Sequence, residues 1–282
     1  MPAPKRSAAS DRSATRVAVI GAGKIGGILL EGFLEQKLLR AENLCASVRH
    51  PDRARELAAR LPVSVGTDNR AAARRADVVL VAVKPQTVRE VLEEIRPELG
   101  PGKLVISVAA SVPLASLEKF VGPRVPVVRA MPNTPCLVRR GMIALARGAH
   151  ATDAHLETAQ TLFATVGRTI VVDEKLMDAV TGLSASGPAF IYVILESLAE
   201  GGVKVGLPRD VATLLAAQTA LGAASVVLET GAHPALLKDA VTTPAGCTID
   251  GLLELEEGRL RVTLIKAVVK AVKRAGELWL EP

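Results

Sequence analysis

The stretch RVAVIGAGKIGGILLEGFL, residues 16–34, decides the fold of the first half of the chain. A short aliphatic run leads directly into Gly21-x-Gly23-x-x-Gly26, and a helical pattern follows. In this context the first glycine permits a tight turn, the second lets a pyrophosphate approach the backbone, and the third lets the helix pack on the strand. A glycine turn without a ligand is the alternative. We predict a dinucleotide site at this helix N-terminus, formed by Gly21, Ala22, Gly23, Lys24, Ile25 and Gly26.

Short aliphatic runs alternate with helical patterns from residue 16 to about residue 172. Runs that are apolar without alternation are typical of strands buried on both faces, so we expect an α/β fold with a largely parallel, doubly wound sheet. After Asp173 only helical patterns follow. We therefore expect three parts, namely a disordered tail (1–15), a Rossmann-type dinucleotide-binding domain (16–173) and an all-α dimerisation and substrate domain (174–282).

The longest of the expected helices, residues 208–230, is apolar almost all round. A helix of this kind has to be buried, and a small helical domain has little interior in which to bury it. We predict that a second subunit covers it, which makes the protein a homo-oligomer. The alternative is a central helix that its own neighbours bury.

Composition argues against several kinds of partner. The net charge is +6, but four basic residues against one acid lie in residues 1–16, and aromatic residues make up only 2% of the chain, so no nucleic acid is expected. Cys45, Cys136 and Cys247 lie far apart without a CxxC motif, so neither a disulfide framework nor a metal site is expected. We expect no membrane partner, because serines and prolines interrupt the apolar runs, and a cytoplasmic location. A transit peptide in residues 1–15 is the alternative.

The ends of the second, fourth and fifth expected strands should line the rest of the dinucleotide site. Ser47 and Arg49 stand where NAD-binding proteins place an acidic residue, and a hydroxyl with a guanidinium suits a 2′-phosphate. We therefore predict NADPH, with NADH as the second choice. Arg49 and Lys84 could each also be an ordinary surface charge. The nicotinamide half of the site is expected at Ala82, Val83, Lys84, Pro85, Ala109 and Ala110.

The loop DAVTTPAGCTIDG, residues 239–251, is rich in threonine and in small residues. Small residues leave backbone N–H groups accessible, and Thr248 can cap the helix that follows. We predict a binding site for a carboxylate without a cationic side chain. A plain turn between two helices is the alternative. The expected substrate-binding residues here are Thr243, Ala245, Gly246, Cys247 and Thr248.

The stretch TGLSASGPAFIY, residues 181–192, could hold a nucleophilic serine or a group of hydrogen-bond donors. A serine-hydrolase elbow needs Gly-x-Ser-x-Gly after a strand, but Ser186 stands at the last position and no strand precedes the motif. We expect the start of a long helix here, with Ser186 as the capping residue and Pro188 in the first turn. Ser184 and Ser186 are then donors near a carboxylate or the nicotinamide.

Six segments, in this order and at this spacing, together resemble the pyrroline-5-carboxylate reductase family: VIGAGKIG, AVKP, RAMPNTP, TGLSASGPAF, GGVKVGLPRD and LKDAVTTPAGCTIDGL. The similarity covers about residues 17–278. It implies reduction of 1-pyrroline-5-carboxylate to L-proline by NAD(P)H, the last step of proline biosynthesis. It also implies a homodimer in which loop 243–248 faces the partner subunit's nicotinamide, with a decamer of dimers as the larger assembly. The cofactor residues it implies are Gly21 to Gly26, Ser47, Arg49, Asn69 and Ala82 to Pro85.

The resemblance also implies roles for single residues. The Thr248 hydroxyl would hydrogen-bond the ring nitrogen of the imine, with backbone donors from Gly246 and Cys247 near its carboxylate. Ala245 and Ala185 stand where many relatives have glycine, which is tolerated only if neither backbone requires a positive φ. Two other functions fit the same dinucleotide motif, namely reduction of another imine or of a hydroxyacid, and NADP sensing without catalysis.

Overall fold

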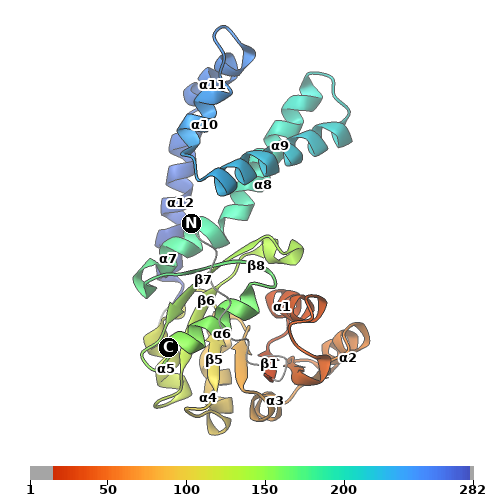
Figure 1. Cartoon of the computed structure of the whole chain (residues 1–282), viewed down its shortest axis with the longest axis vertical. Coiled ribbons are helices and arrows are strands. Elements are labelled where there is room, and N and C mark those ends of the chain that lie inside the picture. The colour runs from red at the N-terminus through yellow and green to blue at the C-terminus, as the bar shows by residue number, and fades with distance from the viewer. Residues whose placement is uncertain (1–14, 280–282) are drawn as a thin grey trace. The chain divides into compact units, whose positions relative to one another are not determined.

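The fold is described from a computed structural model, which covers residues 15–279 (Figure 1). Within this range the chain packs as two compact units, residues 15–185 with 272–279, and residues 186–271. The first unit extends past Asp173 because Met177 and Ala185 pack into a core of the sheet. All but the last residue of the expected tail, 1–15, lies outside the described residues.

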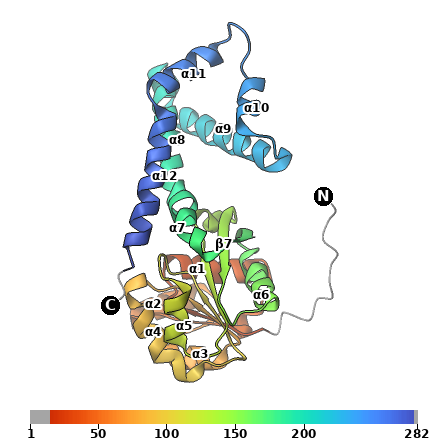
Figure 2. The same cartoon turned by 90° about the vertical axis from the view of Figure 1, so that its left-hand side faces the viewer.

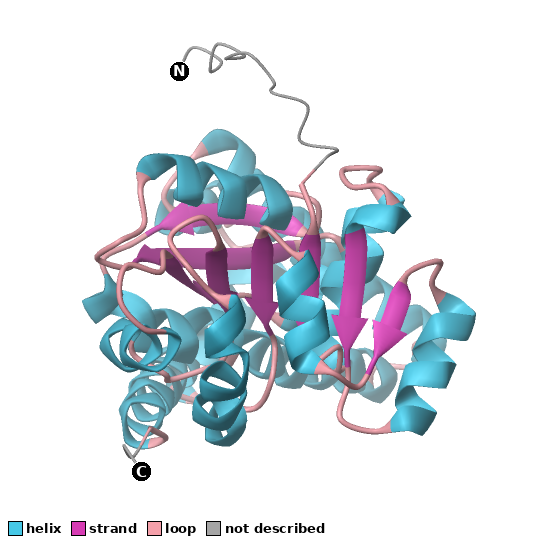
Figure 3. Cartoon of the chain, turned by 90° about the horizontal axis from the view of Figure 1, so that it is seen from below, coloured by secondary structure: helices cyan, strands magenta, loops and turns pink. Residues whose placement is uncertain are grey.

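One sheet runs through the first unit, with the strand order β3-β2-β1-β4-β5-β6-β7-β8 (Figure 3). Neighbouring strands are parallel except β6 and β7, which pair antiparallel. This order confirms the expected doubly wound, largely parallel sheet of the Rossmann type. The strands are β1 (Val17–Ile20), β2 (Leu44–Ser47), β3 (Ser64–Gly66), β4 (Val78–Val81), β5 (Leu104–Ser107), β6 (Val127–Met131), β7 (Gly141–Arg147) and β8 (Gly167–Val171).

Helices cover both faces of this sheet (Figure 3). One hydrophobic core lies under α1 (Lys24–Glu35), α2 (Pro51–Arg60) and α6 (Asp153–Phe163). The other lies under α3 (Asn69–Arg75), α4 (Val88–Ile95), α5 (Leu114–Val121) and α7 (Met177–Val180). The central strands β1, β4, β5 and β6 are buried on both faces, which explains why they read as mostly aliphatic runs, whereas the edge strands β3 and β8 are largely exposed.

The second unit is all-helical. It contains α8 (Gly187–Lys204), α9 (Arg209–Thr230), α10 (Pro234–Ala240), α11 (Cys247–Glu257) and most of α12 (Leu260–Glu277). Helices α8 and α9 pack against each other (Figure 2). Only Ala212 and Ala216 of α9 are buried, so the alternative in which its own neighbours bury this helix is wrong. Its large exposed apolar residues are Val211, Leu214, Leu215, Leu221, Val226 and Leu228.

By length and composition alone, two helical runs could also cross a membrane. They are Glu174–Lys204 and Arg209–Thr230. Such a test does not distinguish a membrane span from a helix that another protein chain covers. We interpret the exposed apolar side chains as a subunit interface, for reasons given with the site below.

The single tryptophan of the chain lies in the first unit. Trp279, after the end of α12, packs on Phe120 of α5, with 6.4 Å between the ring centroids. The guanidinium carbon of Arg89, on α4, lies over the Phe120 ring, 5.8 Å from its centroid. Trp279 thus packs against the core under α4 and α5.

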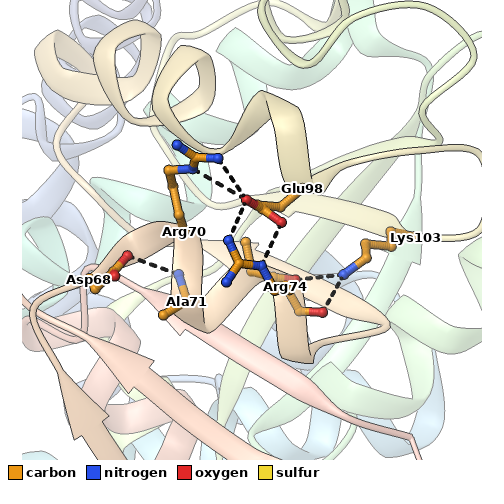
Figure 4. A network of polar contacts seen from close by, with 7 residues as sticks. Asp68, Arg70, Ala71, Arg74, Glu98 and Lys103 are labelled. Carbon is orange, nitrogen blue, oxygen red and sulfur yellow. Dashed lines mark hydrogen bonds and ion pairs between the residues drawn. The ribbon is translucent and has the colours of Figure 1, made fainter.

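Helix α3 is held in place by charged side chains (Figure 4). Asp68 caps its N-terminus by accepting the N–H of Ala71 at 2.9 Å. Glu98, in the 3₁₀ turn Arg96–Glu98, accepts hydrogen bonds from Arg70 and Arg74. Hydrogen bonds from Arg74 and then Arg70 lower the pKa of Glu98 to about 2. This network joins α3 to the end of α4.

Replacing Glu98 by glutamine should lower the melting temperature by a few degrees at neutral pH, because it removes the charge that both arginines bind. The folded-state pKa of about 2 lies below the ordinary 4.5, so the stabilisation is complete above pH 4.5. It is lost as the pH falls from 4.5 toward 2, and melting curves of the two proteins should converge over this range. Glu90→Gln, in the exposed part of α4, is the control. A difference that persists at pH 2 would contradict the assignment.

Candidate active site

The glycine turn after β1 is crowded at two of its glycines and open at the third. Gly21 has φ +85°, and a Cβ atom there would lie 2.5 Å from Cγ1 of Val83. At Gly26 a Cβ atom would lie 2.7 Å from the Gly21 carbonyl oxygen and 3.2 Å from Cβ of Ala82. At Gly23 the nearest atom would be 4.0 Å away. The turn therefore brings the ends of β1 and β4 together and leaves room for a ligand at Gly23.

The N-terminus of α1 offers free donors at this turn. No side chain caps the helix and no acidic residue lies in its first turn. The first backbone bond inside the helix runs from the N–H of Gly27 to the carbonyl oxygen of Gly23, so the preceding N–H groups of the first turn lack helical partners. An exposed helix N-terminus with these donors binds phosphate, and the turn fits the pyrophosphate of a dinucleotide.

At the carboxyl end of β2, Ser47 and Asn69 lie in contact. The Ser47 hydroxyl donates to Oδ1 of Asn69 at 2.7 Å, and Nδ2 of Asn69 donates to a carboxylate oxygen of Glu94 at 2.7 Å. Ser47 is fully buried, and its carbonyl oxygen accepts the N–H of Gly21 at 2.9 Å. Arg49 is exposed close to this end of the strand. Glu94, on α4, was missed by sequence reasoning because it lies far from β2 in the sequence.

The end of β4 lies beside the glycine turn, and β5 pairs with β4 on the side away from β1. Lys84 is exposed, and its carbonyl oxygen accepts the N–H and the hydroxyl of Thr87, both at 3.0 Å. Ala109 is buried, and its N–H donates to the Ser107 hydroxyl at 3.3 Å. Ser111 has φ +65°, and its buried hydroxyl has no hydrogen-bond partner. Nothing in the sequence marked Ser111, since serine rarely adopts a positive φ.

The stretch around Ser184 is a π-helical turn, Thr181–Ala185, between α7 and α8. Nδ2 of Asn133 donates to the Ser184 carbonyl oxygen at 3.1 Å, and Oδ1 of Asn133 accepts the N–H of Met142 at 2.9 Å. Ser186 stands at the N-cap of α8 and Pro188 in its first turn, as expected, but the expected capping hydrogen bond is missing. The backbone of Ser186 already has helical φ and ψ, because the helical run begins before this residue. Its side chain therefore makes no capping hydrogen bond. A π-turn is also not the strand-to-helix elbow of a serine hydrolase.

The loop before α11 belongs to the second unit. Gly246, not Thr248, is the N-cap of α11, so the expected capping role of Thr248 is wrong. Thr248 lies in the first turn, half-buried, and its hydroxyl has no hydrogen-bond partner among the described residues. The N–H of Gly246 donates to the Thr243 carbonyl oxygen at 3.1 Å, which leaves Cys247 and the residues after it as the free backbone donors.

Ala245 has φ +55°, whereas Ala185 lies in the π-turn without a positive φ. Ala245→Gly should therefore stabilise the protein by about 0.5 kcal/mol, because relief of left-handed strain exceeds the entropy lost. Ala185→Gly is the matched control and should destabilise by about 0.5–1 kcal/mol. Chemical denaturation measures both. Equal effects of the same sign would show that the backbone at Ala245 is not strained.

Two family models match the chain. Residues 174–278 match the pyrroline-5-carboxylate reductase dimerisation domain, and residues 16–111 match the model described as NADP oxidoreductase coenzyme F420-dependent. With the glycine turn and the two-domain plan, these matches define an NAD(P)-dependent oxidoreductase. The match to a dimerisation domain supports the expected homodimer and the interface at α9.

Relatives of known name narrow this class. A pyrroline-5-carboxylate reductase from Methanosarcina acetivorans is 44% identical over 93% of this chain and 97% of its own length, and one from Arabidopsis thaliana is 41% identical over 93% and 95%. The chain belongs to the pyrroline-5-carboxylate reductase family, as its motifs led us to expect. This membership confirms the enzyme class and the two-part fold.

Solved structures agree. The enzyme of this name from Coxiella burnetii has a TM-score of 0.88 and 36% identity, covering 94% of this chain and 99% of its own. That from Plasmodium falciparum, solved with NADP bound, has a TM-score of 0.85 and 30% identity, covering 94% and 98%. A prephenate dehydrogenase from A. aeolicus, with a TM-score of 0.55 and 15% identity, shares the fold alone.

Metal-ligating and thiol groups are sparse in the site. Among residues 15–279, no group of three or more His, Cys, Asp or Glu residues is placed to hold a metal ion. The three cysteines are free, with Cys136 buried and Cys247 exposed beside Thr248. Burial raises the pKa of the Cys45 and Cys136 thiols, which keeps both in the unreactive neutral form.

Proposed function

We propose that this protein reduces 1-pyrroline-5-carboxylate to L-proline, the last step of proline biosynthesis. The observation that carries the proposal is the loop before α11. It offers an uncapped helix N-terminus and the free hydroxyl of Thr248, without a cationic side chain among residues 241–251. Such a site suits a small substrate that has one carboxylate and a polar ring nitrogen.

The reaction demands little acid–base chemistry of the protein. NADPH held at the glycine turn would supply the hydride for the imine carbon, and the protonated imine nitrogen would take up the C=N π electrons to give the amine. Backbone N–H groups from Cys247 onward bind the substrate carboxylate, with Thr243 and Ala245 shaping the loop around it. The Thr248 hydroxyl hydrogen-bonds the ring nitrogen and thereby orients the imine carbon. The Ser184 and Ser186 hydroxyls serve as further donors near the carboxylate or the nicotinamide.

The cofactor residues proposed are those at the strand ends. The α1 N-terminus binds the pyrophosphate, while Ser47, Arg49 and Asn69 bind the adenosine ribose and its 2′-phosphate. The nicotinamide lies at Ala82, Val83, Lys84, Pro85, Ala109 and Ala110. The Gly23 opening and the uncapped helix support this assignment.

The remaining proposals concern organisation and location. Residues 16–173 bind the dinucleotide, and residues 174–282 dimerise and supply the substrate loop to the partner subunit. A decamer of dimers is the proposed larger assembly, and the cytoplasm the proposed compartment. The exposed apolar side chains of α9 support the dimer.

The experiment that tests the function follows NADPH oxidation by the purified protein with pyrroline-5-carboxylate as substrate. Six-membered cyclic imines and hydroxyacids are assayed alongside. The five-membered imine should be the best substrate by kcat/KM. A folded protein that binds NADPH but does not turn over this imine would refute the proposal.

A further inference from the structure

A chain of hydrogen bonds joins β2, α3 and α4 where the cofactor ribose is proposed to bind. The Ser47 hydroxyl donates to Oδ1 of Asn69, and Nδ2 of Asn69 donates to Glu94, both at 2.7 Å. The Glu94 carboxylate can only accept, so the amide nitrogen must face it and the amide oxygen must face Ser47. The direction of every donor in the chain is thereby set by Glu94.

The members of this chain are held in place from several sides. Ser47 is fully buried in β2. Asn69 is the first residue of α3, which Asp68 caps and which Glu98 binds through two arginines (Figure 4). The contact between Asn69 and Glu94 is therefore part of a fixed junction between α3 and α4.

This arrangement changes what the site offers a ribose. Ser47 is fully buried and its hydroxyl proton is used on Asn69, so this hydroxyl offers a ligand no donor. Glu94 adds a negative charge, and no basic side chain among the described residues pairs with it. A ribose 2′-hydroxyl can donate to the exposed Glu94 carboxylate, whereas a 2′-phosphate only accepts and carries nearly two negative charges at neutral pH.

We propose that Glu94, acting through Asn69, discriminates between the two nicotinamide cofactors by favouring the 2′-hydroxyl of NADH over the 2′-phosphate of NADPH. Arg49, exposed near the same strand end, has the opposite effect, because its guanidinium attracts the 2′-phosphate. Glu94 and Arg49 together set the ratio of the affinities for NADPH and NADH. This inference rests on the proposed function, because it takes the cofactor ribose to lie at the end of β2. NAD-binding proteins place an acidic residue directly after the second strand. In this chain Glu94 of α4 takes that place.

Glu94→Gln tests this, because glutamine keeps an oxygen that accepts from Asn69 and removes only the charge. Dissociation constants for NADPH and NADH are measured by titration of the purified full-length protein without imine. NADPH should bind about five- to tenfold more tightly to this variant, because the repulsion between the Glu94 carboxylate and the doubly charged 2′-phosphate is gone. The gain should shrink at high salt, because salt already screens that repulsion in the wild type. NADH affinity should change by less than about twofold, since its ribose is uncharged.

Glu93→Gln is the matched control, since Glu93 is the exposed neighbour that pairs with Arg89 at 3.0 Å along α4. It should leave the ratio of the two affinities unchanged. The wild type has first to bind both cofactors and reduce the imine. Given that, the inference is overturned if Glu94→Gln leaves the ratio of the two affinities unchanged or shifts both affinities equally. A wild type that binds neither cofactor would instead overturn the proposed function and this inference together.

Discussion

Leu214→Asp should convert the protein to a monomer and lower its rate of imine reduction at least about a hundredfold. Leu214 is 68% exposed in the isolated chain, and α9 buries only two alanines within it. A carboxylate at this position would be buried without a partner in a dimer, which costs several kcal/mol. Because the substrate loop is proposed to act on the partner subunit's nicotinamide, a monomer lacks a complete site. Light scattering measures the assembly and an NADPH oxidation assay the activity.

Leu214→Met is the matched control, because it keeps an apolar side chain of similar volume. It should remain a dimer with normal activity. The aspartate variant should still bind NADPH, since the glycine turn lies in the other unit. A monomeric aspartate variant with full activity would contradict the contribution of loop 243–248 across the interface.

Thr248→Ala should lower kcat about ten- to hundredfold and leave NADPH affinity unchanged, because one hydrogen bond that orients the reacting imine is lost. The Thr248 hydroxyl lacks a hydrogen-bond partner within the described residues and lies in the first turn of α11. The alanine change therefore removes nothing that the fold itself uses. Steady-state kinetics with pyrroline-5-carboxylate, together with NADPH titration, measure the two effects separately.

Two variants control for this result. Thr248→Ser restores a hydroxyl and should recover most of the lost kcat. Thr242→Ala removes a hydroxyl from the same loop that already donates to the Lys238 carbonyl oxygen at 2.7 Å, and kcat should stay near the wild-type value. Normal kcat in Thr248→Ala would exclude the proposed role of this hydroxyl.

The sheet could be predicted from the sequence because its signals are local. Strands buried on both faces read as aliphatic runs, and the glycine motif follows directly after one of them, so both can be read without the distant β4 residues that these glycines contact. The exposed α9 was likewise visible from its all-round apolar pattern. Both features show as patterns of apolar residues and glycines along short stretches of the chain.

The parts of the site that escaped prediction depend on long-range contacts or on backbone angles. Glu94 reaches Asn69 only through the packing of α4 on α3, and Asn133 reaches the Ser184 carbonyl across 51 residues. The π-turn keeps a helical hydrophobic pattern, so its extra residue leaves no clear periodic signal. The positive φ of Ala245 could not be predicted, because alanine, unlike glycine, gives no sign in the sequence of a left-handed backbone.

The position of Trp279 has a practical consequence for spectroscopy. Because it is the single tryptophan in the chain and packs on Phe120 beside α4, its fluorescence reports one defined place in the first unit. Reduced nicotinamide absorbs where indole emits, so energy transfer from Trp279 should follow cofactor binding without any attached dye. Each subunit thus carries its own optical probe, whose emission will also redden if Trp279 leaves the core under α4 and α5.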